Sequence, residues 1–296
     1  MLFVASFAST HAHAADAVQE KVCGKYTIKI EGKQTLNEPT DGQGKLEIFK
    51  DGKSVLSQED WNYQFGVSSE EDASMKEGCP DITGDKVPDL VVTSYSGGAH
   101  CCSTTYIFGL GDEVKLMDTL ETGHSEGRFE DIDQDGIPEF IANDWTFAYW
   151  NTSFSSSPAP AIILKFKNGK YRLAGDLMRK PPPSLEDRKK MLDQIRADIA
   201  EINTMIEEER ASNPNAETPT YLGWIRNGVI IPPSAWGYLL DLMYTGQASV
   251  ARRFIHEIVP DHEKEKEEFM AELEGQLRQS PYWPEISKIL EISSWE

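Results

Sequence analysis

Hydrophobic and polar positions alternate along much of the chain between Lys25 and Leu173, which is the pattern of half-buried β-strands. The predicted strands cover residues 26–30, 45–49, 90–95, 104–110, 114–120, 139–143, 161–166 and 170–173. Two dipeptides typical of tight hairpin turns, Asp51-Gly52 and Asn168-Gly169, follow Phe49 and Phe166. This segment therefore predicts an antiparallel, meander-like β domain.

Beyond Pro181-Pro182-Pro183 the spacing of apolar residues becomes helical. The proline run predicts a stiff spacer, and Ser184 with Asp187 three residues later is typical of a helix start. The helix that begins there is expected to end at Asn213-Pro214. Further helices are predicted over 232–244, 248–259 and 261–278, with a short last one near Ile286. The fold class predicted is α+β, an N-terminal β domain followed by a C-terminal helical domain.

The expected organisation has four parts: a signal peptide over 1–14, a β domain over 15–178, a Pro-rich linker over 179–183 and a helical domain over 184–296. The first part combines an apolar core with an A-x-A cleavage site at Ala12-His13-Ala14, although no basic residue precedes the core. No other stretch has the length needed to cross a bilayer. We therefore expect a periplasmic or secreted protein without a transmembrane segment.

The composition narrows the classes of partner. A length of 296 residues is sufficient for two domains with their own cores. The formal net charge is −20, so nucleic acid and anionic membrane surfaces would be repelled. An excess of carboxylates favours cations instead.

The same acidic pattern occurs twice, 50 residues apart, each time directly before an apolar strand. The copies are Asp81-Ile-Thr-Gly-Asp-Lys-Val-Pro-Asp89 and Asp131-Ile-Asp-Gln-Asp-Gly-Ile-Pro-Glu139. A period of this size indicates a repeated supersecondary unit.

The second copy has the chemistry of a calcium loop. Its carboxylates stand at alternate positions, a glycine permits a sharp turn, and a further acid closes the loop. This arrangement brings hard oxygen ligands close together, and Ca²⁺ takes six to eight of these. The predicted ligands are the side chains of Asp131, Asp133, Asp135 and Glu139 and the backbone carbonyl of Ile137.

An EF-hand is excluded, because its loop needs a glutamate at position 12, where this chain has Ala142. The spacing resembles instead the calcium loops of FG-GAP (integrin-α-like) and VCBS-type repeats, over Asp81 to Asn143. The resemblance implies a loop that joins two strands and a propeller-like arrangement. About 160 residues would supply only about three blades, so we expect a partial or collapsed version.

The first copy departs from this pattern. Thr83 replaces the second carboxylate and Lys86 stands where the glycine is expected, with Gly84 two residues earlier. The corresponding ligand positions are Asp81, Thr83, Asp85, Val87 and Asp89. We expect weaker calcium binding here than in the second copy. For both copies the alternative is an acidic turn ordered by its own backbone hydrogen bonds.

The four cysteines are Cys23, Cys79, Cys101 and Cys102. In an exported protein an even number predicts two disulfides, with three possible connectivities. A bond between adjacent cysteines needs a strained ring, so the favoured pairings join Cys101 and Cys102 to Cys23 and Cys79. The alternative is a reactive or metal-binding thiol pair.

Two further segments contain candidate functional residues. One is Ser96-Gly-Gly-Ala-His-Cys-Cys102, which resembles a signature of exported bacterial proteins with FG-GAP-like loops. Its His100 has two interpretations. It acts as a metal ligand or general base, or it is a hydrogen-bonded residue of a turn. Trp145, Phe147 and Tyr149 alternate, so as a strand they would share one face, either in the core or lining a groove for a glycan or peptide.

These observations predict an exported calcium-binding scaffold with a structural ion, whose ligand is a protein or a cell-envelope glycan. The FG-GAP resemblance implies binding rather than chemistry, and no common catalytic motif is present. The alternative is a calcium-supported hydrolase that uses His100 with Asp144 or Glu139.

Overall fold

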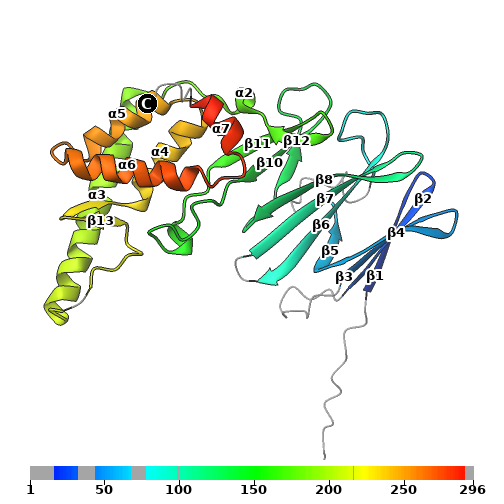
Figure 1. Ribbon diagram of the computed structural model, residues 1–296, viewed down its shortest axis with the longest axis horizontal. Coiled ribbons are helices and arrows are strands. Elements are labelled where there is room, and N and C mark those ends of the chain that lie inside the picture. Colours follow the sequence, from blue (N-terminus) through cyan, green and yellow to red (C-terminus); the bar gives the residue numbers. More distant parts are fainter. Residues whose placement is uncertain (1–16, 33–43, 68–77, 99–100, 216, 291–296) are drawn as a thin grey trace, which may run out of the picture. The chain divides into compact units, whose positions relative to one another are not determined.

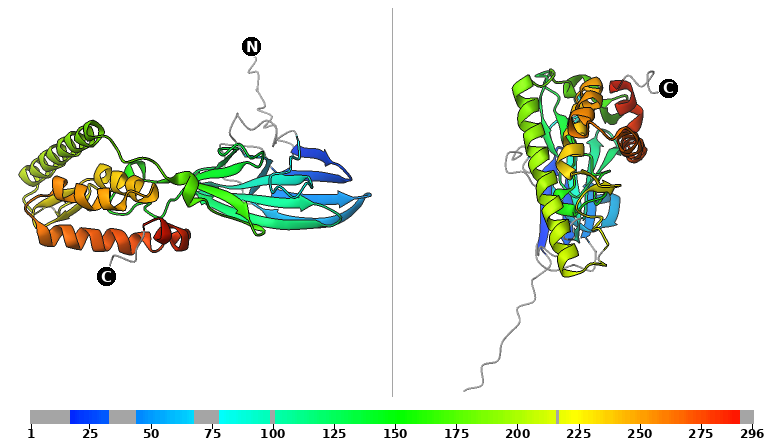
Figure 2. Two further views of the ribbon diagram at one scale, coloured as in Figure 1. Left: turned by 90° about the horizontal axis from the view of Figure 1, so that it is seen from above. Right: turned by 90° about the vertical axis from the view of Figure 1, so that its left-hand side faces the viewer.

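The computed structural model describes residues 17–32, 44–67, 78–98, 101–215 and 217–290 (Figures 1 and 2). The predicted signal peptide and His100 lie outside these ranges. By its internal contacts the chain divides into two compact units, Met1–His124 and Ser125–Glu296. These contacts place the strands between residues 128 and 173 in the same unit as the helices. The sequence composition instead predicts a domain boundary after residue 178.

The first unit contains two antiparallel four-stranded sheets, each a simple meander. One sheet comprises β1 (Ala17–Cys23), β2 (Tyr26–Gly32), β3 (Gly44–Lys50) and β4 (Lys53–Asp60). The other comprises β5 (Asn62–Phe65), β6 (Asp89–Gly98), β7 (Cys101–Leu110) and β8 (Val114–Gly123). The Asp51-Gly52 turn between β3 and β4 is confirmed, with φ of +50° and +75°.

The two sheets of this unit share one hydrophobic core. Alternate side chains of β2 and β3, such as Ile28 and Ile48, pack in the same cluster as Leu90 and Val92 of β6 and Phe108 of β7. The alternation seen in the sequence is thus the alternation between core and solvent along each strand.

The second unit begins with a third four-stranded meander and continues into helices. Its sheet comprises β9 (Arg128–Glu130), β10 (Glu139–Asn143), β11 (Ala161–Lys167) and β12 (Lys170–Leu173). A short 3-10 turn, η1 (Phe154–Ser156), lies between β10 and β11. The remaining elements are α2 (Gly175–Met178), α3 (Leu185–Ser212), the hairpin β13 (Trp224–Arg226) and β14 (Val229–Ile231), α4 (Pro233–Tyr244), α5 (Ala248–Ile258), α6 (Glu263–Leu277) and α7 (Trp283–Ile289).

The long helix α3 begins as the sequence predicts. The hydroxyl of Ser184 accepts a hydrogen bond from the backbone N–H of Asp187 at 3.1 Å, so the N-cap is satisfied. The helix continues without a break to Ser212 (Figure 2), and buries Ile195, Ile202 and Ile206.

Asp144, directly after β10, links the sheet of the second unit to its helices. Its side chain is 2% exposed. One carboxylate oxygen accepts hydrogen bonds from the hydroxyls of Tyr244 in α4 (2.7 Å) and Ser280 after α6 (2.5 Å). The other accepts from the N–H of Thr146 at 2.9 Å. Burial beside this carboxylate raises the pKa of Tyr244 well above its usual value.

The predicted α+β class is confirmed: antiparallel sheets precede a largely helical region. The described strands include three successive four-stranded antiparallel meanders. The relation to a propeller stays a prediction.

Candidate metal centre

The second acidic loop connects β9 to β10 as a tight turn. The carboxylate of Asp131 accepts hydrogen bonds from the backbone N–H groups of Asp135 (3.1 Å) and Gly136 (3.0 Å). Gln134 and Gly136 have positive φ, +60° and +88°, a conformation that glycine adopts without steric cost. The alternating aspartates thus form a loop whose first acid organises its own backbone.

The closing acid of this loop, Glu139, is completely buried at the start of β10. Its Oε2 accepts a hydrogen bond from the N–H of Ile132 at 3.0 Å. Carboxylate oxygens of Asp131, Asp133 and Glu139 all lie within 4.8 Å of one another. Oxygens that each lie 2.3–2.6 Å from one Ca²⁺ can be at most about 5.2 Å apart. Three of the predicted ligands therefore form a group that could hold a metal ion.

Lys165, on β11, places its ammonium group among these carboxylates. The strand register sets Phe140 opposite Leu164, which brings Lys165 alongside Glu139. Its Nζ lies 2.5 Å from Asp133 Oδ2, 2.6 Å from Asp135 Oδ2 and 3.0 Å from Glu139 Oε1. These contacts raise the pKa of Lys165 and lower the pKa of Asp135. β11 thus supplies the loop with a counter-ion that sequence reasoning missed.

Two predicted ligands of the second loop have other interactions. Asp135 is outside the compact group, because its Oδ1 accepts the N–H of Ile137 at 2.9 Å and its Oδ2 contacts Lys165. A coordinating role for Asp135 and for the carbonyl of Ile137 stays a prediction.

The first acidic loop has the same backbone design before β6. Asp81 accepts hydrogen bonds from the N–H groups of Gly84, Asp85 and Lys86 at 2.7–3.1 Å. Positive φ occurs at the matching positions, +77° at Gly84 and +68° at Lys86. Lys86 therefore adopts the left-handed conformation in place of glycine.

Asp89 closes the first loop as Glu139 closes the second. Its side chain is completely buried, and Oδ2 accepts hydrogen bonds from the N–H groups of Ile82 (2.9 Å) and Thr83 (3.0 Å). Its Oδ1 has no hydrogen-bond partner among the described residues. Burial raises the pKa of Asp89 to about 6. The position opposite Asp89 on β7 is Gly109, so this loop has no equivalent of Lys165.

Among the described residues, acidic, histidine or cysteine side chains come close enough to share a metal ion in the second loop, where three of them do so. Ligation by Asp81, Thr83, Asp85, Val87 and Asp89 of the first loop stays a prediction.

The favoured cysteine pairing is wrong. Cys23 is bonded to Cys79, with Cα atoms 5.9 Å apart. Cys79 lies beside the start of β6, because the N–H of Asp89 donates to the carbonyl of Pro80. Cys101 pairs with Gly98 at the other end of the ten-residue strand β6, roughly 30 Å away at about 3.3 Å per residue. Cys102 is also disulfide-bonded, and its partner is neither Cys23 nor Cys79.

The predicted aromatic strand is a turn. The N–H groups of Ala148 and Trp150 donate to the carbonyls of Trp145 and Phe147, and Tyr149 has a φ of +60°. The three aromatic residues therefore do not share one face: Phe147 is completely buried, whereas Tyr149 is 55% exposed. Trp145 and Tyr149 each pack against Phe154 instead, with ring centroids 5.3 and 5.5 Å from it.

No helix among the described residues is long and apolar enough to span a membrane. His100, the proposed base of the hydrolase hypothesis, lies outside the described residues. Its proposed partner Asp144 is occupied by the hydrogen bonds from Tyr244, Ser280 and Thr146.

Comparison with known proteins gives partial similarities. The chain is 32% identical over 85 residues to a probable thylakoid lumen protein of Synechocystis sp., covering 28% of this chain and 25% of that protein. It is 30% identical over 79 residues to an uncharacterized protein of Sinorhizobium fredii, covering 26% and 12%. The chain thus spans a quarter or less of the length of these relatives. No family model matches, and no solved structure matches significantly.

Proposed function

We propose that this chain is an exported calcium-binding protein in which Ca²⁺ in the Asp131–Glu139 loop has a structural role. The observation that supports this most directly is the convergence of Asp131, Asp133 and Glu139 within 4.8 Å, with Glu139 completely buried. Crowded carboxylates repel one another, and a hard divalent cation relieves that repulsion. The ion would also fix the junction between β9 and β10.

An extracytoplasmic location is supported by three observations. The Cys23–Cys79 disulfide is typical of an oxidising compartment. The sequence begins with an apolar core and an A-x-A site. One partial relative is a probable thylakoid lumen protein. We propose, more specifically, that the protein is periplasmic or secreted.

We further propose that the protein binds a protein or cell-envelope glycan. Trp145, Phe154 and Tyr149 form an aromatic cluster of which Tyr149 is largely exposed. Rings of this kind give a large contact area at low entropic cost. The adjoining segment lines a pocket of about 650 Å³ with α3, in which Thr152, Pro158, Ile202 and Tyr221 take part.

The test is thermal unfolding of the chain in millimolar calcium and in excess chelator. If free calcium exceeds its dissociation constant a hundredfold, the ion adds about 2.7 kcal/mol, which raises the melting temperature by about 5–10 °C. Asp133→Asn removes a ligand charge from a residue that organises no loop N–H, so it should abolish the shift without disrupting the turn.

The matched control is Asp193→Asn, which removes an exposed carboxylate from α3 and should leave the calcium shift intact. An equal melting temperature with calcium and with chelator, in a folded and metal-free protein, would contradict the proposal.

A further inference from the structure

Lys165 contacts two of the three residues of the candidate metal site, Asp133 and Glu139. Its Nζ contacts Asp133, Asp135 and Glu139 within 3.0 Å, and its side chain is only 16% exposed. Glu139 has no access to solvent, and a buried carboxylate without a compensating charge is costly. In the state that the structure describes, Lys165 supplies this compensation.

The ammonium group and a metal ion would need the same carboxylates. Asp133 and Glu139, which contact Lys165, are two of the three residues whose oxygens could hold an ion. A Ca²⁺ bound to both would lie only a few ångströms from Nζ, and two positive charges so close repel strongly at low dielectric. Occupancy by Lys165 and occupancy by the ion therefore exclude each other.

We propose that Lys165 is a tethered competing cation that Ca²⁺ must displace, and that it thereby sets the calcium affinity and the preference for divalent ions. A monovalent ion would replace one positive charge by another, so it gains no electrostatic energy. A divalent ion adds a net positive charge among four carboxylates. This inference rests on the proposed calcium binding and identifies the residue that regulates it.

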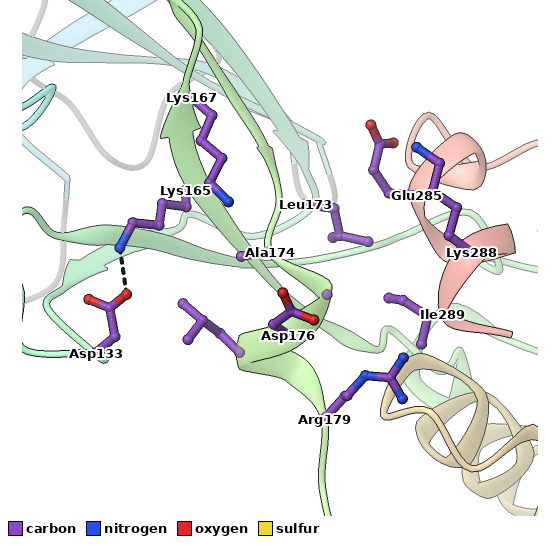
Figure 3. A pocket seen from close by; sticks show the side chains of 12 residues that line it. Asp133, Lys165, Lys167, Leu173, Ala174, Asp176, Arg179, Glu285, Lys288 and Ile289 are labelled. Atoms are coloured by element: carbon purple, nitrogen blue, oxygen red, sulfur yellow. Dashed lines mark hydrogen bonds and ion pairs between the residues drawn. The ribbon is translucent and has the colours of Figure 1, made fainter. Parts of the chain in front are cut away.

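A pocket lies beside the ammonium group of Lys165. Lys165 and Asp133 line one side of a pocket of about 430 Å³ in the second unit (Figure 3). Asp176 on α2 and Glu285 on α7 line the same pocket, together with Lys167, Arg179 and Lys288. A displaced ammonium group would therefore enter surroundings that contain two carboxylates and three other cationic side chains.

The first acidic loop offers an internal comparison. It has the same turn and the same buried closing acid, but Gly109 lies opposite Asp89 where Lys165 lies alongside Glu139. Asp89 Oδ1 and Glu139 Oε1 both lack a hydrogen-bond partner among the described residues, but Glu139 Oε1 has the ammonium group of Lys165 3.0 Å away. The turn therefore forms without an internal cation, which makes Lys165 a feature of the second site rather than a requirement of the loop.

The experiment compares Lys165→Met with the wild-type chain in calorimetric calcium titrations of chelator-treated protein. Methionine keeps an unbranched apolar stem and removes the charge. We expect the dissociation constant to fall about tenfold, which is 1.4 kcal/mol. When the two proteins are compared at the same ionic strength, sodium chloride should weaken calcium binding more in Lys165→Met than in the wild type. Na⁺ can enter the site once the ammonium group of Lys165 is absent.

Lys167→Met is the matched control. Lys167 lies two residues further along β11, is exposed and forms no ion pair within the described ranges. Its removal changes the net charge equally, and because the field of an exposed charge is weakened by water at high dielectric and by salt, it should change the affinity less than about twofold.

The outcomes separate this inference from the proposed function. Equal calcium affinity of Lys165→Met and wild type overturns the role of Lys165 and leaves calcium binding standing. Binding by Lys165→Met but not by the wild type supports the inference and overturns calcium binding by the native chain. Failure of both folded proteins to bind overturns both.

A second measurement needs no variant. Amine labelling followed by mass spectrometry should show Lys165 protected in chelator and at least about fivefold more reactive in calcium, because its ammonium group leaves the carboxylates. Lys167 should label equally in both conditions. Unchanged protection of Lys165 in a calcium-bound protein would overturn the inference even if Lys165→Met fails to fold.

Discussion

Asp89 and Glu139 occupy equivalent positions at the ends of the two acidic loops, yet their charge environments differ. Glu139 faces the ammonium group of Lys165 at 3.0 Å, whereas burial raises the pKa of Asp89 to about 6. The sequence identified both acids from their spacing. The difference between them arises from the residue on the neighbouring strand, which the loop sequence does not contain.

Asp89 gives a prediction about pH. The unfolded carboxyl group loses its proton near its ordinary pKa of 3.8 and the folded one only near 6. The unfolded state therefore releases a proton first as pH rises, and this group's contribution to the free energy of unfolding falls between about pH 4 and 6 by up to about 3 kcal/mol. Urea unfolding of the wild type and Asp89→Asn in chelator, across this range, measures the difference.

Asparagine cannot ionise, so Asp89→Asn should lose this part of the pH dependence. Asp85→Asn is the control, because Asp85 is exposed in the same loop and its Oδ1 accepts a bond that an amide oxygen can keep. Parallel pH profiles for the wild type and Asp89→Asn would contradict the raised pKa.

At the scale of elements, features set by a few adjacent residues were predictable. The Asn168-Gly169 hairpin is confirmed, with φ of +53° and +82° between β11 and β12. The segment around Phe147 shows the limit of this reasoning. Its alternation fits a strand, but Asp144 accepts the N–H of Thr146 and Tyr149 takes a positive φ, so the chain turns instead.

Features that depend on distant segments were not predictable from the pattern. Lys165 reaches the acidic loop through the register of β10 and β11, which are separated by the irregular segment 144–160. Cys79 reaches Cys23 because the chain before β6 lies beside the end of β1. In both cases the sequence identified the chemical group, but the partner required the sheet register.

Asp144 gives a prediction at this scale, because it joins β10 to the helices. Asp144→Ala leaves the buried hydroxyl groups of Tyr244 and Ser280 without their acceptor. An unsatisfied buried polar group costs about 1–3 kcal/mol, so we expect a loss of about 3 kcal/mol. Urea unfolding followed by tryptophan fluorescence measures it, since Trp150 and Trp236 pack together in this unit.

Asp176→Ala is the control for this substitution, because Asp176 is exposed on α2 and forms no ion pair within the described part of the chain. It should change the free energy of unfolding by less than about 0.5 kcal/mol. A similarly small effect of Asp144→Ala would mean that Asp144 does not hold the sheet and helices together.

At the scale of the whole molecule, the division into two units determines where each stabilising feature acts. The Cys23–Cys79 bond closes a loop of sequence separation 56 within the first unit. Asp144 and the Lys165 cluster belong to the second unit. If each unit has its own core, disturbing one should leave the stability of the other largely unchanged.

Cys23→Ser/Cys79→Ser tests this expectation. Removing the cross-link restores chain entropy to the unfolded first unit, and for a loop of this length the loss of stability is about 4 kcal/mol. Hydrogen exchange followed by mass spectrometry should show faster exchange in β2 and β3, because these strands open when the first unit unfolds. Exchange in β11 should not change, whereas Asp144→Ala should produce the opposite distribution. Acceleration of both sets of strands by either variant would mean that the units unfold as one, and that calcium bound in the second unit also stabilises the first.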